Sequence, residues 1–253
     1  MGEDMDPARC ALGIDVGGTG IKGAVVDVTT GELVTTRFRL ETPQPATPTA
    51  VRDTVGAVVT EIGFSGATGL DFPAPISDGV VMLAANLDKS WIGKRVGEVI
   101  DPVLPRPGTY LNDADAAALA EVRFGAGKGV KGLAIMVTFG TGIGIGLIHN
   151  GVLIPNAELG HIEIDGHDAE SRAAASARDR EGLSWKQWAK RANKYLTTLE
   201  NLLYPQVFLL GGGITKNPEK WLPLLETRTP LRVATLANNA GIVGAALAAH
   251  EAG

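Results

Sequence analysis

One short glycine pattern occurs twice in the chain and constrains the fold more than any other feature. Residues 18–26 begin Gly-Thr-Gly-Ile and continue as an apolar strand, and residues 140–148 repeat this order 122 positions later. Each copy lies between two apolar runs rich in β-branched residues, which predicts a strand, a glycine turn and a second strand. The sequence therefore predicts one architecture built twice.

Strand and helix patterns alternate along the rest of the chain. We expect strands at residues 11–16, 21–28, 35–40, 67–72, 79–83, 109–111, 133–138, 143–148, 207–210 and 231–236. We expect helices at residues 48–62, 92–100, 115–124, 169–181, 184–204 and 240–250. This mixture predicts an α/β fold in two lobes. The expected parts are a disordered lead-in (1–10), an N-terminal lobe (11–112), a C-terminal lobe (113–239) and a terminal helix (240–253) that packs back near the N-terminal lobe.

Composition excludes several classes of protein. The 253 residues carry a formal net charge of −5, so no global positive field attracts nucleic acid or an anionic membrane. The single cysteine, Cys10, excludes an internal disulfide and any multi-thiolate metal site, and it suits a reducing cytoplasm. Residues 132–157 contain no Lys, Arg, Asp or Glu, but their six glycines and Pro155 give too little helix propensity for a membrane span. We expect a cytoplasmic protein without a nucleic-acid or membrane partner.

The two glycine turns are suited to binding phosphate. Glycine lets backbone N–H groups converge without an obstructing Cβ atom, and a threonine hydroxyl adds another donor. Lys22 is equally well explained as a phosphate contact or as an exposed hairpin lysine. The candidate phosphate-binding residues are Gly17, Gly18, Thr19, Gly20, Lys22, Gly140, Thr141 and Gly142.

The glycine turns also resemble two other nucleotide-binding motifs in part. The spacing of Gly18, Gly20 and Gly23 matches the dinucleotide fingerprint, but that motif must open a helix and residues 21–28 predict a strand. A phosphate-binding loop of the Walker type is absent, because Gly93-Lys94 is followed by Arg95. Two ordinary hairpin turns without a ligand remain the alternative.

Five segments occur in a fixed order along the chain: Asp15-Val16-Gly17-Gly18-Thr19, Asn112-Asp113-Ala114-Asp115-Ala116-Ala117, Thr138-Phe139-Gly140-Thr141-Gly142, Glu158-Leu159-Gly160-His161 and Gly211-Gly212-Gly213-Ile214. Together they resemble the motifs of the ROK (repressor, open reading frame and kinase) family of sugar kinases, over about residues 11–250. Pro43-Gln44-Pro45, residues 86–91 and Leu183-Ser184-Trp185 resemble the members of that family that use polyphosphate on glucose and mannose.

The resemblance implies a two-lobed actin-like (ribonuclease H-like) sugar kinase fold with the active site in the cleft between the lobes. It implies transfer of a phosphoryl group from inorganic polyphosphate, and also from ATP, to the 6-hydroxyl of glucose. An ATP-dependent hexokinase without polyphosphate preference is the alternative within the family. A homodimer fits the family. The segment Pro73-Ala74-Pro75 departs from the usual Pro-Gly, which leaves the choice between glucose and mannose open.

Asp113 is the candidate catalytic base, because transfer to a hydroxyl needs a carboxylate that accepts the proton. From the local sequence, an N-cap role for Asp113 is equally plausible, with Asp115 as the other candidate cap. The resemblance assigns Asp113 to the 6-hydroxyl of the sugar. It also implies that the sugar hydroxyls are bound by Asn86, Asn112, Asp113, Glu158, His161 and, with less support, Glu170.

Asp15 is the candidate residue for orienting Mg²⁺, directly or through water, and an ordinary turn aspartate is the alternative. Zinc is not expected, because the cysteine cluster that much of the family has after the histidine is absent. His161, Glu163 and Asp165 alternate with apolar residues, which predicts three possible metal ligands on one strand face. One histidine with two carboxylates is a thin ligand set for a metallohydrolase.

Two features concern the phosphate donor. Lys186, Lys190 and Lys194 form one stripe of a predicted helix, with Arg191 beside it, and this stripe can guide a polyphosphate chain or be a solvated helix face. Gly211, Gly212 and Gly213 follow a strand at the place where this superfold binds the adenosine of ATP, as the resemblance implies.

Two functions of other classes fit parts of the sequence. A sugar-sensing regulator needs a DNA-reading element, and the first hairpin starts at residue 11, which leaves little room for one. An actin-like assembling ATPase would use both turns but would leave Asn112, Asp113, Glu158 and His161 without a task.

Overall fold

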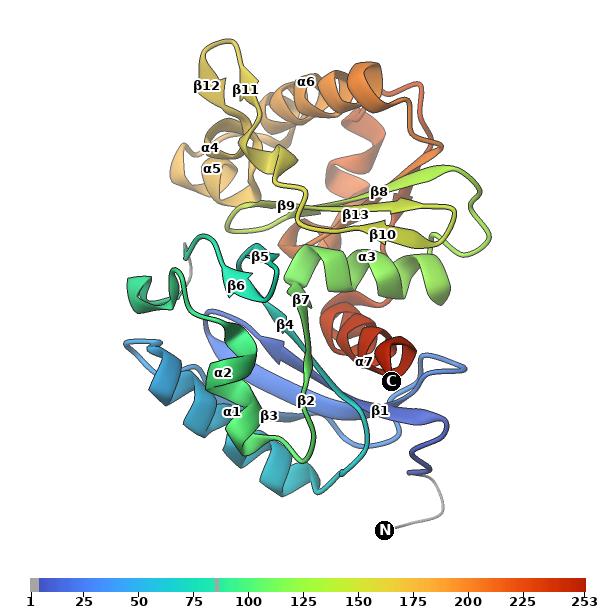
Figure 1. Cartoon of the computed structure of the whole chain (residues 1–253). Coiled ribbons are helices and arrows are strands. Elements are labelled where there is room, and N and C mark those ends of the chain that lie inside the picture. Colours follow the sequence, from blue (N-terminus) through green and yellow to red (C-terminus); the bar gives the residue numbers. More distant parts are fainter. Residues whose placement is uncertain (1–4, 85–86) are drawn as a thin grey trace. The chain divides into compact units, whose positions relative to one another are not determined.

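The computed structural model describes residues 5–84 and 87–253. The chain divides into two compact units (Figure 1). Unit 1 comprises the chain up to Ala120 together with Asn238–Gly253, and unit 2 comprises Glu121–Ala237. Each unit has its own five-stranded sheet and its own hydrophobic core.

The sheet of unit 1 has the strand order β3-β2-β1-β4-β7. Its strands are β1 (Cys10–Val16), β2 (Gly20–Asp27), β3 (Phe38–Glu41), β4 (Thr68–Phe72) and β7 (Thr109–Asn112). The first three strands are antiparallel neighbours, whereas β1, β4 and β7 run parallel. The carboxyl ends of β1, β4 and β7 therefore lie at the same edge of the sheet.

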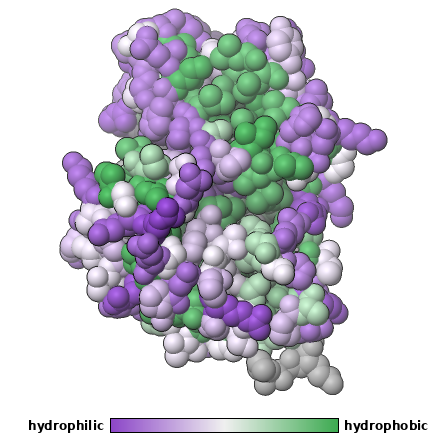
Figure 2. All heavy atoms as spheres, in the orientation of Figure 1, coloured by the Kyte–Doolittle hydropathy of each residue, from purple (hydrophilic) through white to green (hydrophobic). Residues whose placement is uncertain are grey.

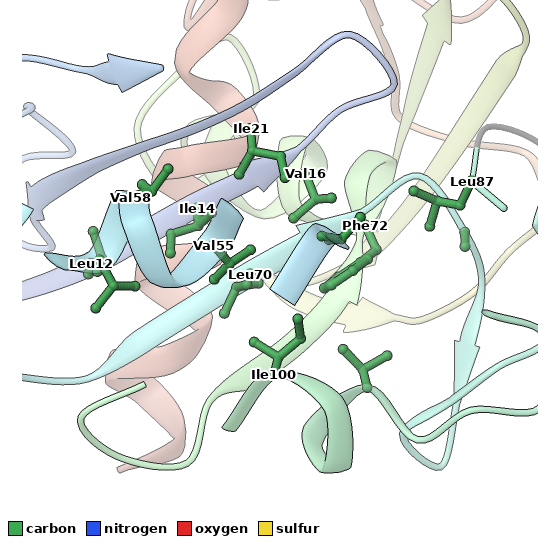
Figure 3. Close-up of a cluster of buried hydrophobic side chains, with 14 of the residues drawn as sticks. Leu12, Ile14, Val16, Ile21, Val55, Val58, Leu70, Phe72, Leu87 and Ile100 are labelled. Atoms are coloured by element: carbon green, nitrogen blue, oxygen red, sulfur yellow. The ribbon is translucent and has the colours of Figure 1, made fainter. Parts of the chain in front are cut away.

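Helix α1 (Pro48–Ile62) begins at the N-cap Thr47, whose side chain accepts a hydrogen bond from the Ala50 amide, and Pro48 occupies the first helical position. Val51, Val55, Val58 and Val59 are buried, as the sequence predicts. They pack with alternate residues of β1, including Leu12 and Ile14 (Figure 3). Because side chains alternate across a strand, Gly13 and Asp15 face the other side of the sheet.

That other side is covered by helix α7 (Ala240–Ala252), which packs on β1 and β4. A Cβ atom at Gly69 of β4 would lie 1.9 Å from the carbonyl oxygen of Ala245. A Cβ atom at Gly13 of β1 would lie 1.9 Å from the carbonyl oxygen of Ile242. The backbone of α7 thus contacts the sheet directly, and glycine is required for this approach.

The sheet of unit 2 has the order β10-β9-β8-β13-β14. Its strands are β8 (Leu133–Phe139), β9 (Ile143–His149), β10 (Val152–Ile154), β13 (Val207–Gly211) and β14 (Leu231–Val233). The pattern of antiparallel and parallel pairs is that of unit 1, so the predicted repeat is confirmed. The last pair of the hairpin is Val16 with Ile21 in unit 1 but Phe139 with Ile143 in unit 2, so four residues (17–20) separate the paired positions in unit 1 and three (140–142) in unit 2.

The core of unit 2 is built around helix α6 (Trp185–Leu203). A capping box of Ser184 and Gln187 starts the helix. The rings of Trp188 and Tyr195 pack edge-on against Phe139 at the end of β8. This packing fixes the strand end that precedes the second glycine turn.

The remaining elements are short. They are the hairpins β5 (Ile76–Ser77) with β6 (Val80–Val81) and β11 (Glu163–Ile164) with β12 (His167–Asp168), and the helices α2 (Val96–Ile100), α3 (Asp113–Arg123), α4 (Ala169–Ala173) and α5 (Ala175–Arg180). The 3₁₀ helices are η1 (Lys89–Trp91), η2 (Asp101–Val103), η3 (Leu159–His161), η4 (Gly213–Lys216), η5 (Pro218–Lys220), η6 (Leu222–Leu224) and η7 (Ala237–Asn239).

Several expected boundaries are wrong. The helix expected at residues 92–100 is confined to Val96–Ile100, because Gly93 lies in a turn with positive φ. The helix expected at residues 169–181 is broken at Ala174, whose backbone is extended. The strand face expected to join His161, Glu163 and Asp165 does not form, because His161 ends a 3₁₀ helix and the strand is only Glu163–Ile164.

No helix in the described residues is long and apolar enough to cross a membrane.

Candidate functional site

The first glycine turn, residues 17–19, joins β1 to β2, and its residues Gly18 and Thr19 are exposed. Its carbonyl oxygens accept hydrogen bonds from side chains that follow or lie in β3: Thr42 Oγ1 bonds Gly17 O (2.5 Å), Gln44 Nε2 bonds Gly18 O (3.4 Å) and Arg39 Nη2 bonds Thr19 O (2.7 Å). The amides of Gly18 and Thr19 donate to no group in the part of the chain that the structure describes. With the carbonyls bound and the amides free, the turn presents donors to an anion.

The second glycine turn, residues 140–142, has the same arrangement with different partners. Ser176 donates its backbone N–H to Gly140 O (3.0 Å) and its hydroxyl to Thr141 O (2.6 Å). Within residues 5–84 and 87–253, the amides of Thr141 and Gly142 have no acceptor. Each unit therefore has one turn with free N–H groups, which is the property that binds phosphate oxygens.

The third glycine run lies against the second turn. Gly212 has φ of 84°, and a Cβ atom there would lie 2.5 Å from the carbonyl oxygen of Phe139, the residue before Gly140. The predicted nucleotide-binding residues Gly211, Gly212 and Gly213 are thus placed beside one of the predicted phosphate-binding turns. Only glycine allows both the positive φ and this close contact.

Asp15, at the end of β1, forms an ion pair with Lys22 of β2. The distance from Lys22 Nζ to Asp15 Oδ2 is 2.6 Å, and both side chains are about one-fifth exposed. Lys22 therefore lies along the hairpin beside Asp15 and is not an extended surface lysine. The pair places one carboxylate and one ammonium group next to the first glycine turn.

Asp71 is paired with Asp15 in the parallel strands β1 and β4 and is completely buried. Neither of its carboxylate oxygens has a hydrogen-bonding partner among the described residues. Burial raises the pKa of Asp71 well above its usual value, the carboxylates of Asp15 and Asp113 raise it further, and Lys22 opposes them. Three carboxylates of unit 1 thus act on one another electrostatically at the carboxyl ends of β1, β4 and β7.

We expect Asp71→Val to stabilise the protein by about 1–3 kcal/mol at pH 7 in buffer without magnesium, because it removes a buried polar group without a partner. The folded-state pKa lies above the unfolded value near 3.9, so the cost of Asp71 appears as the pH rises above that value. The gain in the free energy of unfolding from Asp71→Val should therefore shrink as the pH falls toward 3. Urea unfolding of the parent and the variant at several pH values measures this difference. A variant less stable than the parent at pH 7 would contradict the prediction.

Asn112 and Asp113 lie where β7 meets α3. The side-chain oxygen of Asn112 accepts hydrogen bonds from the Ala114 amide (2.8 Å) and the Asp115 amide (3.3 Å), so Asn112 caps the helix. The alternative in which Asp115 is the cap is wrong, because α3 begins two residues earlier than expected and Asp115 is buried. Asp113 is exposed at the first helical position, where its Oδ1 accepts from the Ala114 amide (2.8 Å).

Glu158 and His161 lie at the two ends of one 3₁₀ turn, in which the His161 amide donates to Glu158 O (3.1 Å). A Cβ atom at Gly160 would lie 2.2 Å from the carbonyl oxygen of Ile143, so this turn packs closely on the first residue of β9. Burial raises the pKa of Glu158, and so does the nearby carboxylate of Glu170, whereas His161 opposes them. These candidate sugar-binding residues therefore lie next to the second glycine turn.

His161 is oriented by a carboxylate that the sequence does not reveal. Its Nδ1 lies 2.8 Å from Asp168 Oδ2, and this hydrogen bond raises the pKa of His161. With the Nδ1 proton directed at Asp168, the neutral ring presents Nε2 as a hydrogen-bond acceptor. Burial raises the pKa of Asp168, but the bonds from His161 and the Ser171 amide outweigh it and lower that pKa.

We expect Asp168→Asn to lower the pKa of His161, measured by NMR titration of the imidazole protons. The raised pKa of His161 favours the folded state below about pH 6.5, and this contribution disappears as the pH rises through the folded-state pKa. Asparagine keeps the N-cap that Asp168 provides to Ser171, so the fold is retained. The control is Asp179→Asn, an exposed carboxylate bonded to Arg178. An unchanged His161 pKa in Asp168→Asn would refute this assignment.

Glu170 contacts the second turn directly. Its Oε2 accepts a hydrogen bond from the Ile143 amide (2.8 Å), and a Cβ atom at Gly142 would lie 2.3 Å from the same oxygen. Glu170 thus contacts the second turn and also acts electrostatically on Glu158 and His161. The remaining sugar-binding candidate, Asn86, lies outside the described residues.

Sequence reasoning missed Asp71, Asp168 and Ser176. A charged residue inside the apolar strand Gly69-Leu70-Asp71-Phe72 is a signal that could have indicated Asp71. No local pattern indicates Asp168 or Ser176, because their partners are brought to them by the fold.

Comparisons with known proteins show the family to which the chain belongs. The profile of the ROK family matches residues 11–177, and the chain belongs to the ROK family. It is 52% identical over 241 residues to polyphosphate glucokinase of Mycobacterium tuberculosis, a match covering 95% of this chain and 91% of that protein.

Two solved structures resemble the chain along most of its length. The inorganic polyphosphate/ATP-glucomannokinase of Arthrobacter sp. strain KM has a TM-score of 0.91 and 49% identity, covering 97% of this chain and 100% of that one. A ROK family glucokinase of Streptomyces griseus in complex with glucose and AMPPNP has a TM-score of 0.80 and 26% identity, covering 96% and 99%. The expected fold, that of the two-lobed actin-like sugar kinases, is confirmed by these similarities.

Proposed function

We propose that the protein transfers a phosphoryl group from inorganic polyphosphate, and also from ATP, to the 6-hydroxyl of glucose, giving glucose 6-phosphate. The observation that carries this proposal is the pair of glycine turns, each with its carbonyls bound by the protein and its amides free. Two such turns in one chain suit a donor with several linked phosphates. The similarity to a polyphosphate glucokinase and to a polyphosphate/ATP-glucomannokinase supports the choice of donor and acceptor.

In unit 1, Asp113 is the proposed general base. Its exposed carboxylate accepts the proton of the sugar hydroxyl as that oxygen attacks the terminal phosphorus atom. Asn112 and Asn86 hold the neighbouring hydroxyls in this proposal. The free amides of the first turn, with Gly17, Gly20 and Lys22 around them, bind phosphate oxygens.

In unit 2, Glu158, His161 and Glu170 are the proposed partners of the remaining sugar hydroxyls. Fixed acceptors of this kind discriminate strongly against sugars that lack a hydroxyl, because a buried polar group would then lose its partner. The second turn, residues 140–142, binds phosphate, and residues 211–213 beside it lie against the nucleoside when ATP is the donor. The choice between glucose and mannose stays open, as it is in the sequence.

Mg²⁺ is the proposed cofactor, and the donor set fits it. Mg²⁺ takes one or two carboxylates, keeps several waters and binds substrate phosphates. Asp15 is a partly exposed carboxylate next to the first turn and its oxygens are hard ligands of the right kind. When bound, the ion spreads the negative charge of the phosphates. We further propose that the protein works in the cytoplasm as a homodimer, as the family resemblance implies.

Binding of glucose distinguishes this proposal from an assembling ATPase. A bound ligand raises the melting temperature by mass action, so glucose alone should raise that of the purified protein. Galactose, which differs at a single hydroxyl, is the matched control. No shift at high glucose would favour the assembling ATPase.

The donor is tested by initial rates of glucose 6-phosphate formation with long-chain polyphosphate and with ATP at rising salt. We expect salt to weaken the use of polyphosphate more than the use of ATP, because the longer chain engages more screened charges. Equal salt sensitivity would count against guidance of the polyphosphate chain by the stripe of Lys186, Lys190 and Lys194. If only ATP supports glucose 6-phosphate formation, the protein is an ATP-dependent hexokinase and the polyphosphate part of the proposal is wrong.

A further inference from the structure

Unit 2 contains a cavity of about 130 Å³ between the β11–β12 hairpin, α4 and α6. Its apolar wall includes Ala169, Ala173 and Tyr195, and three cationic side chains line it: Arg172, Arg191 and Lys194. Figure 2 shows hydrophilic side chains gathered over the β11–β12 hairpin beside it. We call this cavity the α6 pocket.

The three cations differ in how they are neutralised. Arg191 Nη2 lies 2.7 Å from Glu181 Oε2, and its Nη1 donates to the carbonyl of Arg172 (3.1 Å). Lys194 forms an ion pair with Asp165, which also lines the pocket. The exposed Arg172 guanidinium, in contrast, makes no hydrogen bond or ion pair with any described residue, and it acts on the Glu181 carboxylate only through its charge. Of the three cations, Arg172 is thus the one whose hydrogen-bond donors remain available to an anion.

The pocket is separate from the second glycine turn. Glu170 of α4 contacts that turn through the Ile143 amide, and Arg172 lies two residues further along the same helix. Residues two apart in an α-helix point to nearly opposite sides, so Arg172 faces away from the turn. Lys190 and Lys186 lie one and two turns before Lys194 on the exposed face of α6, and continue the positive charge from the pocket.

Size and charge define the ligand. The volume is well below the several hundred Å³ of a pocket for a drug-sized molecule, so it accepts one small group and not a nucleoside. A guanidinium presents a planar set of donors that matches a phosphate group. The protein carries a net charge of −5, so attraction of a polyanion depends on a local cluster such as this one.

We propose that the α6 pocket binds one phosphate group of an extended polyphosphate chain, through Arg172 with Arg191 and Lys194, and so serves as a second attachment point for the donor. This inference rests on the proposed function, because it concerns the polyphosphate donor. A second contact on the same chain raises the effective concentration of its reactive end, and a short donor gains nothing from it. The pocket therefore makes the enzyme selective for long chains.

The variant that tests this is Arg172→Gln, which removes the guanidinium but keeps a similar length. We expect KM for long-chain polyphosphate to rise about tenfold, with kcat at saturation and both constants for ATP unchanged. Arg106→Gln, an exposed arginine of unit 1 that does not line the pocket, is the matched control for net charge and should change nothing. An equal change in KM for ATP, or no change for long polyphosphate, would overturn the proposal.

Equilibrium binding separates this inference from the proposed function. End-labelled long polyphosphate is titrated by fluorescence anisotropy with the parent protein and Arg172→Gln, without glucose, and inorganic phosphate is tested in parallel as competitor. About tenfold weaker chain binding in Arg172→Gln supports the pocket even if no glucose 6-phosphate is formed, in which case only the proposed function fails. Equal chain binding in the two proteins overturns the pocket. Competition by inorganic phosphate as strong as by the chain identifies a site for free phosphate and also overturns it.

Discussion

Asp113→Asn should lower the turnover of glucose 6-phosphate by about 10²–10⁴, the typical contribution of a general base. Asparagine has the same shape and can still accept the hydrogen bond from the Ala114 amide, so the start of α3 is retained. Its amide cannot take a proton, so only the step in which the sugar hydroxyl is deprotonated is lost. Glucose affinity, measured by calorimetric titration, should stay within a few-fold of the parent, because the amide still binds a hydroxyl.

The matched control is Asp78→Asn, an exposed carboxylate of unit 1 in a turn with φ of 49°. Asparagine tolerates that conformation, so stability and turnover should not change. A base role for Asp113 would be refuted if Asp113→Asn kept turnover within threefold of the parent. A parallel loss of turnover and of glucose affinity would assign Asp113 to binding alone.

Gly69→Ala should destabilise unit 1 by at least the upper end of the about 1–3 kcal/mol that overpacking costs. The new Cβ atom would lie 1.9 Å from the carbonyl oxygen of Ala245 and 3.2 Å from the Cβ atom of Ala249. The obstacle is helix backbone and not a flexible side chain, so relief requires α7 to move away from β4. That movement would also disturb Gly241 of α7, which approaches Asp71 closely.

Gly213→Ala is the control, because a Cβ atom there has no neighbour within 4 Å. Urea unfolding followed by circular dichroism measures both variants. We expect a clear shift of the midpoint to lower urea for Gly69→Ala and almost none for Gly213→Ala. Unchanged midpoints in both would show that α7 does not pack on β4 through backbone contact.

The duplicated sheets could be predicted from the sequence because the repeat is local. Each Gly-Thr-Gly-Ile segment lies between two strands whose burial follows from their own apolar residues, and the helix caps Thr47 and Ser184 are recognisable in place. The one-residue difference between the two hairpin connections could not be predicted. Aligning Gly18 with Gly140 does not align the last paired residues of the preceding strands, Val16 and Phe139, and only the strand pairing shows this. Strand pairing, and not residue identity, sets the turn length.

The errors of boundary have a common cause. Ala174 has an extended backbone in a run of alanines that favours a helix, because Trp188 donates a hydrogen bond to the carbonyl of Ala173 and Ser176 is bonded to the second turn. Tertiary contacts thus override the helix propensity of this segment. The same reason applies to His161, which the sequence places on a strand and Gly160 holds in a 3₁₀ turn against β9.

The candidate site could be predicted where a motif is contiguous and not where it is assembled by the fold. The glycine turns and the Asn112-Asp113 pair each lie within one short segment, so the sequence alone predicts them. Asp71 reaches Asp15 only through the pairing of β1 with β4, and Asp168 reaches His161 through the β11–β12 hairpin. No pattern of residues in the sequence indicates that such partners meet in the fold.

In the proposed function, the two glycine turns and Asp113 carry out one phosphoryl transfer to a sugar. The most direct measurement is the amount of glucose 6-phosphate formed by the purified protein from glucose, Mg²⁺ and long-chain polyphosphate with no nucleotide present, followed by phosphorus NMR. We predict that glucose 6-phosphate accumulates as the polyphosphate shortens, with little inorganic phosphate released. Release of inorganic phosphate without a sugar phosphate, or no consumption of polyphosphate at all, would contradict it.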